Sequence, residues 1–469
     1  MFSWFQRNNT PAVNKRQRLL GSAETALVHA SQQHQGYTKV GEVLHLQGPY
    51  ISVETLSAAI SLLQRRHPVL RSRLQINPEK PDSFLLEEDD TLKLNIRVIP
   101  RKHADHLIFW RQEWRQQEKK ITNIGQGLAE FWLLQDPEDD NDDNSPREII
   151  IICEHSVCDG ISLSSVANEL LIALAGQNDN MFANSLDWPI TMEAAIQRSL
   201  SIIGRVIALG KFIFTAFYMR VINAQSIARI PLGDVDFPLT DMCDFCHTES
   251  CYAMLNKEET QMLVEKCRSK GVTVTSAVSS AILCAASTLV KSEEDHPTAL
   301  RLSIGADTRR RCVPPVSNHD LSYHVSGIMP FILPLRDIPT TSRDMWQLAT
   351  VIGDFIKASV DAGQILALGL IMGKIFQKTL GPPDFSVLPT SAISSWGVLP
   401  FSEDYGRWKL VEMTPFVNMI LGAMPFTILQ NVNGILTIMQ IGADPLVPKS
   451  ILESLCNGTM QKLHQMIEA

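Results

Sequence analysis

The sequence predicts a mixed α/β (α+β) fold arranged as a two-lobed sandwich. In both halves of the chain, apolar segments typical of strands alternate with segments that have helical spacing. The sequence has no internal repeat of about 20–50 residues, which disfavours a solenoid or a propeller. The 469 residues, 45% of them hydrophobic, suffice for two or three domains with substantial cores.

The first half of the chain begins with a strand and a helix. Val40–Gln47 has the composition of a strand, and Ser52–Arg65 places its apolar residues on one helical face. A His-Pro pair then ends the helix, because the residue before proline avoids the helical region. Two further strands, Leu128–Gln135 and Glu148–Glu154, are joined by an acidic hairpin loop at 136–147.

The strand that ends at Glu154 runs into the turn HSVCDG and then into a helix. Apolar residues recur at helical spacing over 161–176, and Gly176 is expected to end this helix. The turn therefore delivers His155 to the end of a sheet, which is a common place for catalytic groups.

We expect three regions along the chain. Residues 1–176 form a first lobe, 177–246 a connection with an apolar helix, and 247–469 a second lobe. In the second lobe, strands are predicted at His247–Leu255 and Ala299–Ala306. A helix begins with a capping box after Asn256, and another covers Thr273–Lys291.

The most apolar stretch of the chain is Ser199–Asn223. Arg205, Lys211 and Arg220 interrupt it, which disfavours a transmembrane helix. Three interpretations stay open: a helix on a membrane surface, a helix that covers a substrate channel, and an ordinary packed helix, which is preferred.

Charge and cysteine usage limit the classes of partner and compartment. The formal net charge is −8, which argues against non-specific nucleic-acid binding. Nine cysteines are too sparse for a disulfide scaffold, and the N-terminus lacks the apolar region of a secretory signal. We expect a cytoplasmic monomer, with peripheral membrane contact left open.

The sharpest local feature is His155-Ser156-Val157-Cys158-Asp159-Gly160. A histidine with a pKa near neutrality can take a proton from a hydroxyl or an amine. Asp159 is expected to hold the turn by pairing with an arginine. From these residues alone, a purely structural histidine is an equal alternative.

This HxxxDG pattern resembles the signature of the chloramphenicol acetyltransferase-like superfamily. That group includes condensation domains of peptide synthetases, alcohol acetyltransferases, polyketide-associated acyltransferases and the plant BAHD acyltransferases. Ala59–Leu74 (AISLLQRRHPVLRSRL) resembles the helix-turn of condensation and alcohol acetyltransferase members. Asp307–Pro315 (DTRRRCVPP) and Ser394–Trp408 (SSWGVLPFSEDYGRW) resemble two BAHD segments. These segments lie in family order and span most of the chain.

Two departures leave the subfamily open. Glu154 stands where many relatives have a first histidine, which is generally not the base in this family. The BAHD sequence DFGWG is replaced by residues 404–408, DYGRW.

The resemblance implies two acetyltransferase-like subdomains that form a V around a central tunnel. Acyl-CoA would enter as cosubstrate from one face, and a small alcohol or amine acceptor from the other. The apolar stretches Ser199–Asn223 and Gln364–Phe376 suggest a hydrophobic acceptor, although both could simply be core. His155 would act as general base without a covalent intermediate, a metal or a permanently bound cofactor. Alternatives are a stand-alone condensation enzyme that uses carrier-bound acyl groups and an inactive relative that binds an acyl ligand.

The resemblance also assigns structural residues near His155. Asp159 would pair with Arg309 from the other lobe, with Arg311 as the runner-up. Gly160 would leave the tunnel floor free of side chains.

Four further residues are candidates for contacts with the substrate. Ser395 and Trp396 are expected near the oxyanion, although SSWG could equally be a tight turn with a packed Trp. Arg310 or Arg311 could contact a coenzyme A phosphate. The slightly preferred alternative is that these arginines belong to a solvated turn with one structural salt bridge.

Cys243, Cys246 and His247 form a CxxCH pattern. Such a pattern can attach haem or contribute to a zinc site. Because we see no export signal and no second pair of ligands, we expect chance clustering in a loop and no metal.

Overall fold

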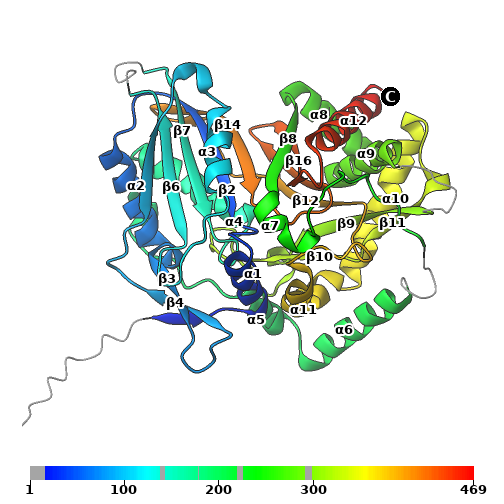
Figure 1. Ribbon diagram of the computed structural model, residues 1–469, viewed down its shortest axis with the longest axis horizontal. Helices are drawn as coiled ribbons and strands as arrows, with labels where there is room; N and C mark the ends of the chain where they lie inside the picture. The colour runs from blue at the N-terminus through cyan, green and yellow to red at the C-terminus, as the bar shows by residue number, and fades with distance from the viewer. Residues whose placement is uncertain (1–15, 138–142, 178, 219–224, 291–297) are drawn as a thin grey trace, which may run out of the picture.

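The computed structural model describes residues 16–137, 143–177, 179–218, 225–290 and 298–469. These residues form two lobes that lie side by side, each built on a sheet with helices packed against it (Figure 1). The predicted mixed α/β class is therefore confirmed.

The first lobe contains a six-stranded sheet in the order β13–β14–β2–β7–β6–β5. Its strands are β13 (Asp404–Tyr405), β14 (Trp408–Val417), β2 (Val40–Gln47), β7 (Pro146–Cys153), β6 (Ala129–Gln135) and β5 (Asn95–Pro100). All neighbours are antiparallel except β5 and β6. The three strands predicted in this half are thus present as β2, β6 and β7. Residues 138–142 of the acidic connection lie outside the described residues.

Helices cover both faces of this sheet. Helices α2 (Val53–Arg66) and α4 (Gly160–Leu174) pack against the side chains of Ile149 and Ile151 on one face. The alternate residues of β7 pack against α3 (Phe109–Gln117) through two tryptophans on the other. A small sheet of β1 (Gln17–Leu19), β4 (Phe84–Glu88) and β3 (Ser72–Ile76) flanks this lobe.

The second lobe contains a seven-stranded sheet in the order β10–β9–β12–β15–β16–β8, with β11 also paired to β9. Its strands are β10 (Val325–Gly327), β9 (Ala299–Asp307), β12 (Ser391–Val398), β15 (Phe426–Val432), β16 (Ile435–Asp444), β8 (His247–Leu255) and β11 (Phe331–Pro334). Its core packs against α8 (Lys257–Lys270), α9 (Val274–Leu289), α10 (Ser342–Asp361) and α12 (Lys449–Glu468). The predicted capping box of α8 is present, since Asn256 and Glu259 bond each other's backbone N–H groups.

The second half of the chain contributes strands to both sheets. After β12 the chain crosses to the first lobe, where β14 pairs antiparallel with β2, and it then returns to the second lobe as β15. The predicted second lobe therefore contributes two strands to the sheet of the first. The proposed boundaries after residues 176 and 246 stay a prediction.

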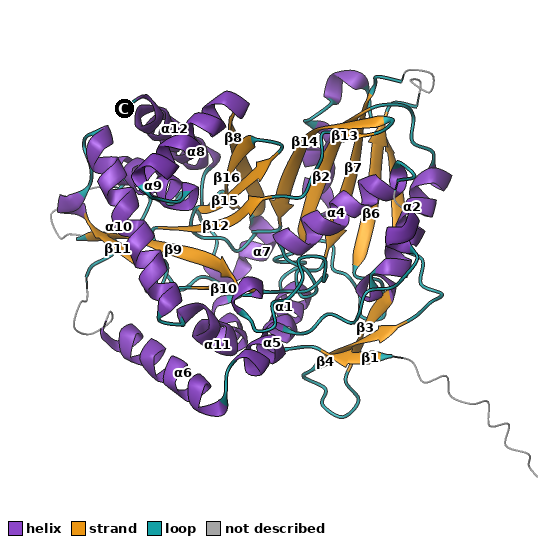
Figure 2. Ribbon diagram, turned by 180° about the vertical axis from the view of Figure 1, so that it is seen from behind, coloured by secondary structure: helices purple, strands orange, loops and turns teal. Residues whose placement is uncertain are grey.

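Several further helices complete the described structure. These are α1 (Ser22–Gln33), α5 (Met192–Ser199), α6 (Ile202–Phe217), α7 (Met242–Phe245) and α11 (Gln364–Thr379). Helix α6 lies at the margin of the molecule in both views (Figures 1 and 2). Its single buried residue is Phe212, so the preferred interpretation of an ordinary packed helix is wrong. Residues 219–223 of the predicted stretch lie outside the described residues.

Among the residues that the structure describes, no single helix is both long and apolar enough to cross a membrane. Three pairs of sharply bent neighbouring helices meet the length and composition criteria only when each pair is taken together.

Candidate active site

The segment HSVCDG forms the turn between β7 and α4. Asp159 caps the helix, because its Oδ1 accepts the Ser162 N–H at 3.0 Å. The Ser162 hydroxyl oxygen accepts the Asp159 N–H in return, also at 3.0 Å. This reciprocal cap fixes where the helix begins and holds the turn that carries His155.

His155 is oriented by the backbone of its own turn. Its Nδ1 lies 2.7 Å from the carbonyl oxygen of Cys158. Since a carbonyl only accepts, Nδ1 carries the proton and Nε2 keeps its lone pair. Burial lowers the pKa of His155 below its usual value. The neutral imidazole is therefore able to take a proton at Nε2. Its ring meets that of Tyr323 edge-on, with 5.2 Å between the centroids.

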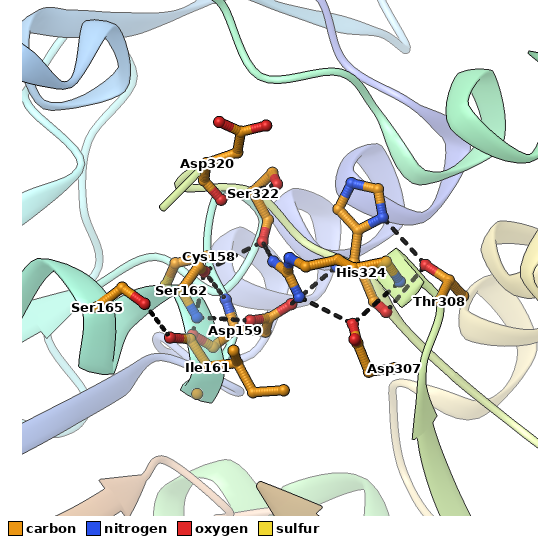
Figure 3. A network of polar contacts seen from close by, with 12 residues as sticks. Cys158, Asp159, Ile161, Ser162, Ser165, Asp307, Thr308, Asp320, Ser322 and His324 are labelled. Atoms are coloured by element: carbon orange, nitrogen blue, oxygen red, sulfur yellow. Dashed lines mark hydrogen bonds and ion pairs between the residues drawn. The ribbon is translucent and has the colours of Figure 1, made fainter. Parts of the chain in front are cut away.

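Asp159 and Arg309 form a buried ion pair between the two lobes (Figure 3). Arg309 Nη1 lies 2.7 Å from Asp159 Oδ2 and 3.1 Å from Asp307 Oδ1, and Nη2 donates to the Ser322 carbonyl at 2.7 Å. The His324 N–H donates to Asp159 Oδ2 at 2.9 Å. The pairing with Arg309 that the resemblance implies is thus present, and the runner-up Arg311 is exposed instead.

The surroundings of Asp159 keep it ionised. Burial raises the pKa of this carboxyl, but the Arg309 charge and the bonds from Ser162 and His324 outweigh burial and leave the pKa below its usual value. These bonds fully account for its orientation without His155. Asp159 therefore acts on the shape of the turn.

Gly160 lies directly against Trp396 of the other lobe. A Cβ atom built on Gly160 would lie 2.2 Å from Trp396 Cε2. The expectation that Gly160 leaves an empty tunnel floor is wrong, because the indole ring fills that space.

Trp396 owes its position to a β-bulge. The register of β12 against β15 shifts between Ser395 and Gly397, and Gly397 has a φ of 75°. The SSWG segment is thus part of a strand and not a tight turn. The bulge turns the Trp396 ring toward the start of α4.

Ser395 and Trp396 line two cavities beside the first turns of α4. A cavity of about 620 Å³ extends between the lobes, and a smaller one of about 30 Å³ reaches Asp159 and Gly160. The Thr275 hydroxyl donates to Ser395 Oγ at 3.0 Å. The hydroxyl hydrogen of Ser395 therefore remains for another acceptor.

Arg310 and Arg311 follow β9 in a short 3-10 turn. Both side chains are exposed, and both line the 620 Å³ cavity. They form a cationic pair at its rim.

A third cavity approaches the turn from its other end. This cavity of about 440 Å³ is lined by Cys153 and Glu154, together with residues from 92–95 and 120–130. Glu154 is buried, and its Oε1 lies 3.5 Å from Lys39 Nζ. Cavities thus reach both ends of the segment that holds His155.

Comparisons with known proteins identify chains of the same fold. The family described as phthiocerol/phthiodiolone dimycocerosyl transferase C-terminus matches residues 247–441. The structure of trichothecene 15-O-acetyltransferase from Fusarium sporotrichioides superposes with a TM-score of 0.75 at 13% identity, covering 96% of each chain. Polyketide synthase associated protein 5 from Mycobacterium tuberculosis gives 0.65 at 18% identity, covering 95% of this chain and 98% of that one. The condensation domain of Monacolin K polyketide synthase MokA gives 0.70 at 10% identity, covering 97% and 98%. A comparison with curated protein sequences gave no match.

The chain therefore has the fold of these acetyltransferase and condensation-domain structures.

The part of the superfamily resemblance that lies in the RHP sequence has a structural explanation. Arg66 Nε and His67 Nε2 lie 2.8 and 2.7 Å from Oε2 of the buried Glu169 on α4. His319 Nδ1, from the other lobe, lies 2.8 Å from Glu169 Oε1. Glu169 was not predicted, although a carboxylate in the middle of an apolar helix is a signal for a buried cationic partner.

Tyr323 and His324 were also missed. Both come from the segment between Arg309 and β10, and nothing in their local sequence sets them apart from a polar loop. Tyr323 touches the His155 ring, and His324 donates its N–H to Asp159.

The CxxCH residues do not converge on one point. Cys243 Sγ lies 3.9 Å from His34 Nδ1, while His247 Nε2 lies 3.3 Å from Asp444. Among the described residues, the group with metal-ligand geometry is a different one, made by His45, His106 and Glu148. The Glu148 carboxylate there already faces the Arg101 guanidinium at 2.9 Å, and this cation opposes a metal ion.

Proposed function

We propose that the protein transfers an acyl group from a thioester to a hydroxyl or amine acceptor, with His155 Nε2 as general base. The fold of acyltransferases and condensation enzymes supports the class of reaction. The observation that carries the role of His155 is its Nδ1 contact with the Cys158 carbonyl, since this contact leaves Nε2 free.

In the proposed reaction, Nε2 takes the proton of the acceptor while the acceptor oxygen or nitrogen attacks the thioester carbonyl. A carbon–oxygen or carbon–nitrogen bond forms, and the carbonyl oxygen becomes an oxyanion. The intermediate then collapses, the carbon–sulfur bond breaks, and the leaving thiolate receives the proton from the imidazolium. Ser395 is our candidate donor to the oxyanion, with its hydroxyl oriented by Thr275.

We further propose acyl-CoA as the donor, entering through the 620 Å³ cavity whose rim carries Arg310 and Arg311. Guanidinium groups suit phosphates through charge-assisted hydrogen bonds. The acceptor, a small hydrophobic alcohol or amine, would approach from the other side of His155.

A thiol-release assay tests this function. Purified protein is offered acyl-CoA of several chain lengths with a panel of alcohols and amines, and then acyl groups on a carrier protein. His155→Ala is the matched control and is expected to abolish transfer while leaving the fold intact. Turnover only with carrier-bound acyl groups would identify a carrier protein, and not coenzyme A, as the acyl donor. A complete lack of turnover, or full activity of His155→Ala, would contradict the mechanism.

A further inference from the structure

Helix α6 presents an apolar face to solvent. Its large side chains on that face are between 52% and 72% exposed, and they are Ile202, Ile203, Val206, Ile207, Ile213, Phe214 and Phe217. At 3.6 residues per turn these positions fall within an arc of about 140°. The opposite side carries the buried Phe212. Helix α6 contacts α11, which lies beside it in Figure 2.

Such a face is unlike the single exposed apolar residues that any protein surface carries. A contiguous apolar surface marks a place where another apolar phase or a partner binds. Only Phe212 of α6 is buried against the rest of the protein. Most of the apolar surface of α6 is therefore available to bind a partner or another apolar phase.

The charge around α6 indicates what this contact is. Residues 194–233 contain no Asp or Glu, although the whole chain has a formal charge of −8. The same stretch contains the cations Arg198, Arg205, Lys211, Arg220 and Arg229. Lys211 is exposed at the border of the apolar arc. An apolar face with the exposed Lys211 at its border, in a stretch of sequence that has cations and no acidic residue, is complementary to the surface of an anionic bilayer.

We propose that α6 lies in the plane of an anionic membrane and buries its apolar face among the lipids. Its 16 residues extend over about 24 Å, which is shorter than the roughly 30 Å of a hydrocarbon core. The chain bends by 111° between α5 and α6, so the two helices do not make one continuous span. Both facts favour a helix that lies on the membrane.

A second copy of the chain is a poorer occupant. If two α6 helices paired with each other, Arg205 and Lys211 would find no acidic group on the partner helix. An anionic headgroup layer supplies the opposite charge at every position along the helix.

Membrane docking has a consequence for the site, and this consequence rests on the proposed function. Helix α11 packs against α6, and its Phe376 ring lies 6.0 Å from that of Tyr323, which touches His155. Helix α11 thus connects the docked helix to the surroundings of the proposed base, and an acceptor dissolved in the lipid phase would suit this arrangement.

Vesicle flotation of the full-length protein tests the docking without any activity assay. Vesicles of phosphatidylcholine with and without phosphatidylserine serve as probes. The wild type is expected to float with the anionic vesicles, and less so as salt rises. Ile203→Ser with Phe214→Ser should weaken binding at least about tenfold, because two exposed apolar side chains no longer enter the lipid. Lys211→Gln should weaken it about fivefold.

The matched control is Ile76→Ser with Ile108→Ser, which alters two exposed apolar residues on the first lobe and should float like the wild type. Wild-type protein that stays unbound with both kinds of vesicle would overturn the proposal. So would equal binding by the α6 double variant. A dimer in solution that depends on Ile203 and Phe214, without vesicle binding, would assign the face to a second copy instead.

Discussion

Gly160 and the indole ring of Trp396 fit against each other so closely that a Cβ atom on Gly160 would lie 2.2 Å from Cε2 and 2.4 Å from Cζ2. Gly160 begins α4 in the first lobe, and Trp396 is the bulged residue of β12 in the second. The contact therefore sets how closely the two lobes approach beside His155.

Gly160→Ala should destabilise the protein by about 1–3 kcal/mol, because the added methyl group forces the Trp396 ring away. Urea unfolding measures this change, and the rate of acyl transfer should fall with it. Adding Trp396→Ala should relieve the clash and restore part of the stability. Gly210→Ala is the control, since no atom lies within 4 Å of a Cβ built there. An unchanged unfolding midpoint for Gly160→Ala would contradict this close packing.

Arg309→Ala should cost about 3–5 kcal/mol, because it leaves the Asp159 carboxylate buried without its cation. Arg309→Lys should not restore this loss, since one ammonium cannot reach Asp159, Asp307 and the Ser322 carbonyl as the guanidinium does. The exposed Arg310→Ala should unfold like the wild type. If Arg309→Ala melts like the wild type, the pair has no structural role.

The same ion pair should appear in the pH dependence of stability. Folding lowers the pKa of Asp159, so its contribution is complete above the unfolded value of about 3.9. The contribution is lost as the pH falls from there through the lowered folded value. Asp159→Asn should therefore be less stable near neutral pH and lose less stability than the wild type on acidification. Parallel stability curves in acid would contradict this assignment.

The pH profile of kcat/KM should report His155. Burial lowers its pKa, so the basic form should persist below pH 6.5, the ordinary value, and the rate should fall only at more acidic pH. His464→Gln, which changes a partly exposed histidine far from this turn, should keep the same profile. An acidic limb centred above pH 6.5 would be inconsistent with a buried base.

Ser395→Ala should lower kcat about 10²–10³-fold if its hydroxyl donates to the oxyanion, with little change in KM. Thr275→Val should have a smaller effect of the same kind, because it removes the hydroxyl that orients Ser395. Thr275→Ser retains that hydroxyl and should recover most of the rate. Steady-state kinetics distinguish these cases, and a wild-type kcat for Ser395→Ala would remove Ser395 from the mechanism.

Arg310→Gln with Arg311→Gln should raise the KM for acyl-CoA about tenfold, since two cations at the rim of the cavity are lost. The KM for an acyl-pantetheine, which lacks the nucleotide phosphates, should barely change. The exposed Arg336→Gln is the control. Equal effects on both donors would show that these arginines do not contact the nucleotide.

Strand bounds and helix caps could be predicted from the sequence, because they depend on residues that are close together in the chain. The bounds of β2 and β8 agree with the prediction, and turn-forming residues follow both strands, Gly48-Pro49 after β2 and Asn256 after β8. The cap of α8 is also as predicted: Asn256 accepts the Glu259 N–H, and Glu259 accepts the Asn256 N–H. These bonds close within one turn of helix, so the sequence contains all of their partners.

The contacts that shape the site join residues far apart in the chain. Asp159 and Arg309 are separated by 150 positions, and only the family resemblance linked them before the structure did. The bulge at Trp396 depends on a register against β15, which the local sequence does not define. The exposure of α6 is likewise invisible in its apolar composition, which suits a buried helix equally well.

The pairing of β14 with β2 has a consequence for how the molecule can come apart. Residues 408–417 close one side of β2, and β7 closes the other. A fragment that ends after the first lobe would leave the backbone N–H and C=O groups of β2 open to any other extended chain. Such an edge promotes aggregation, so we expect the first 176 residues to aggregate when expressed alone. Because β14 of the first sheet lies between β12 and β15 of the second in the chain, unfolding of one sheet should disrupt the other. This connection favours one cooperative unfolding transition over two separate ones.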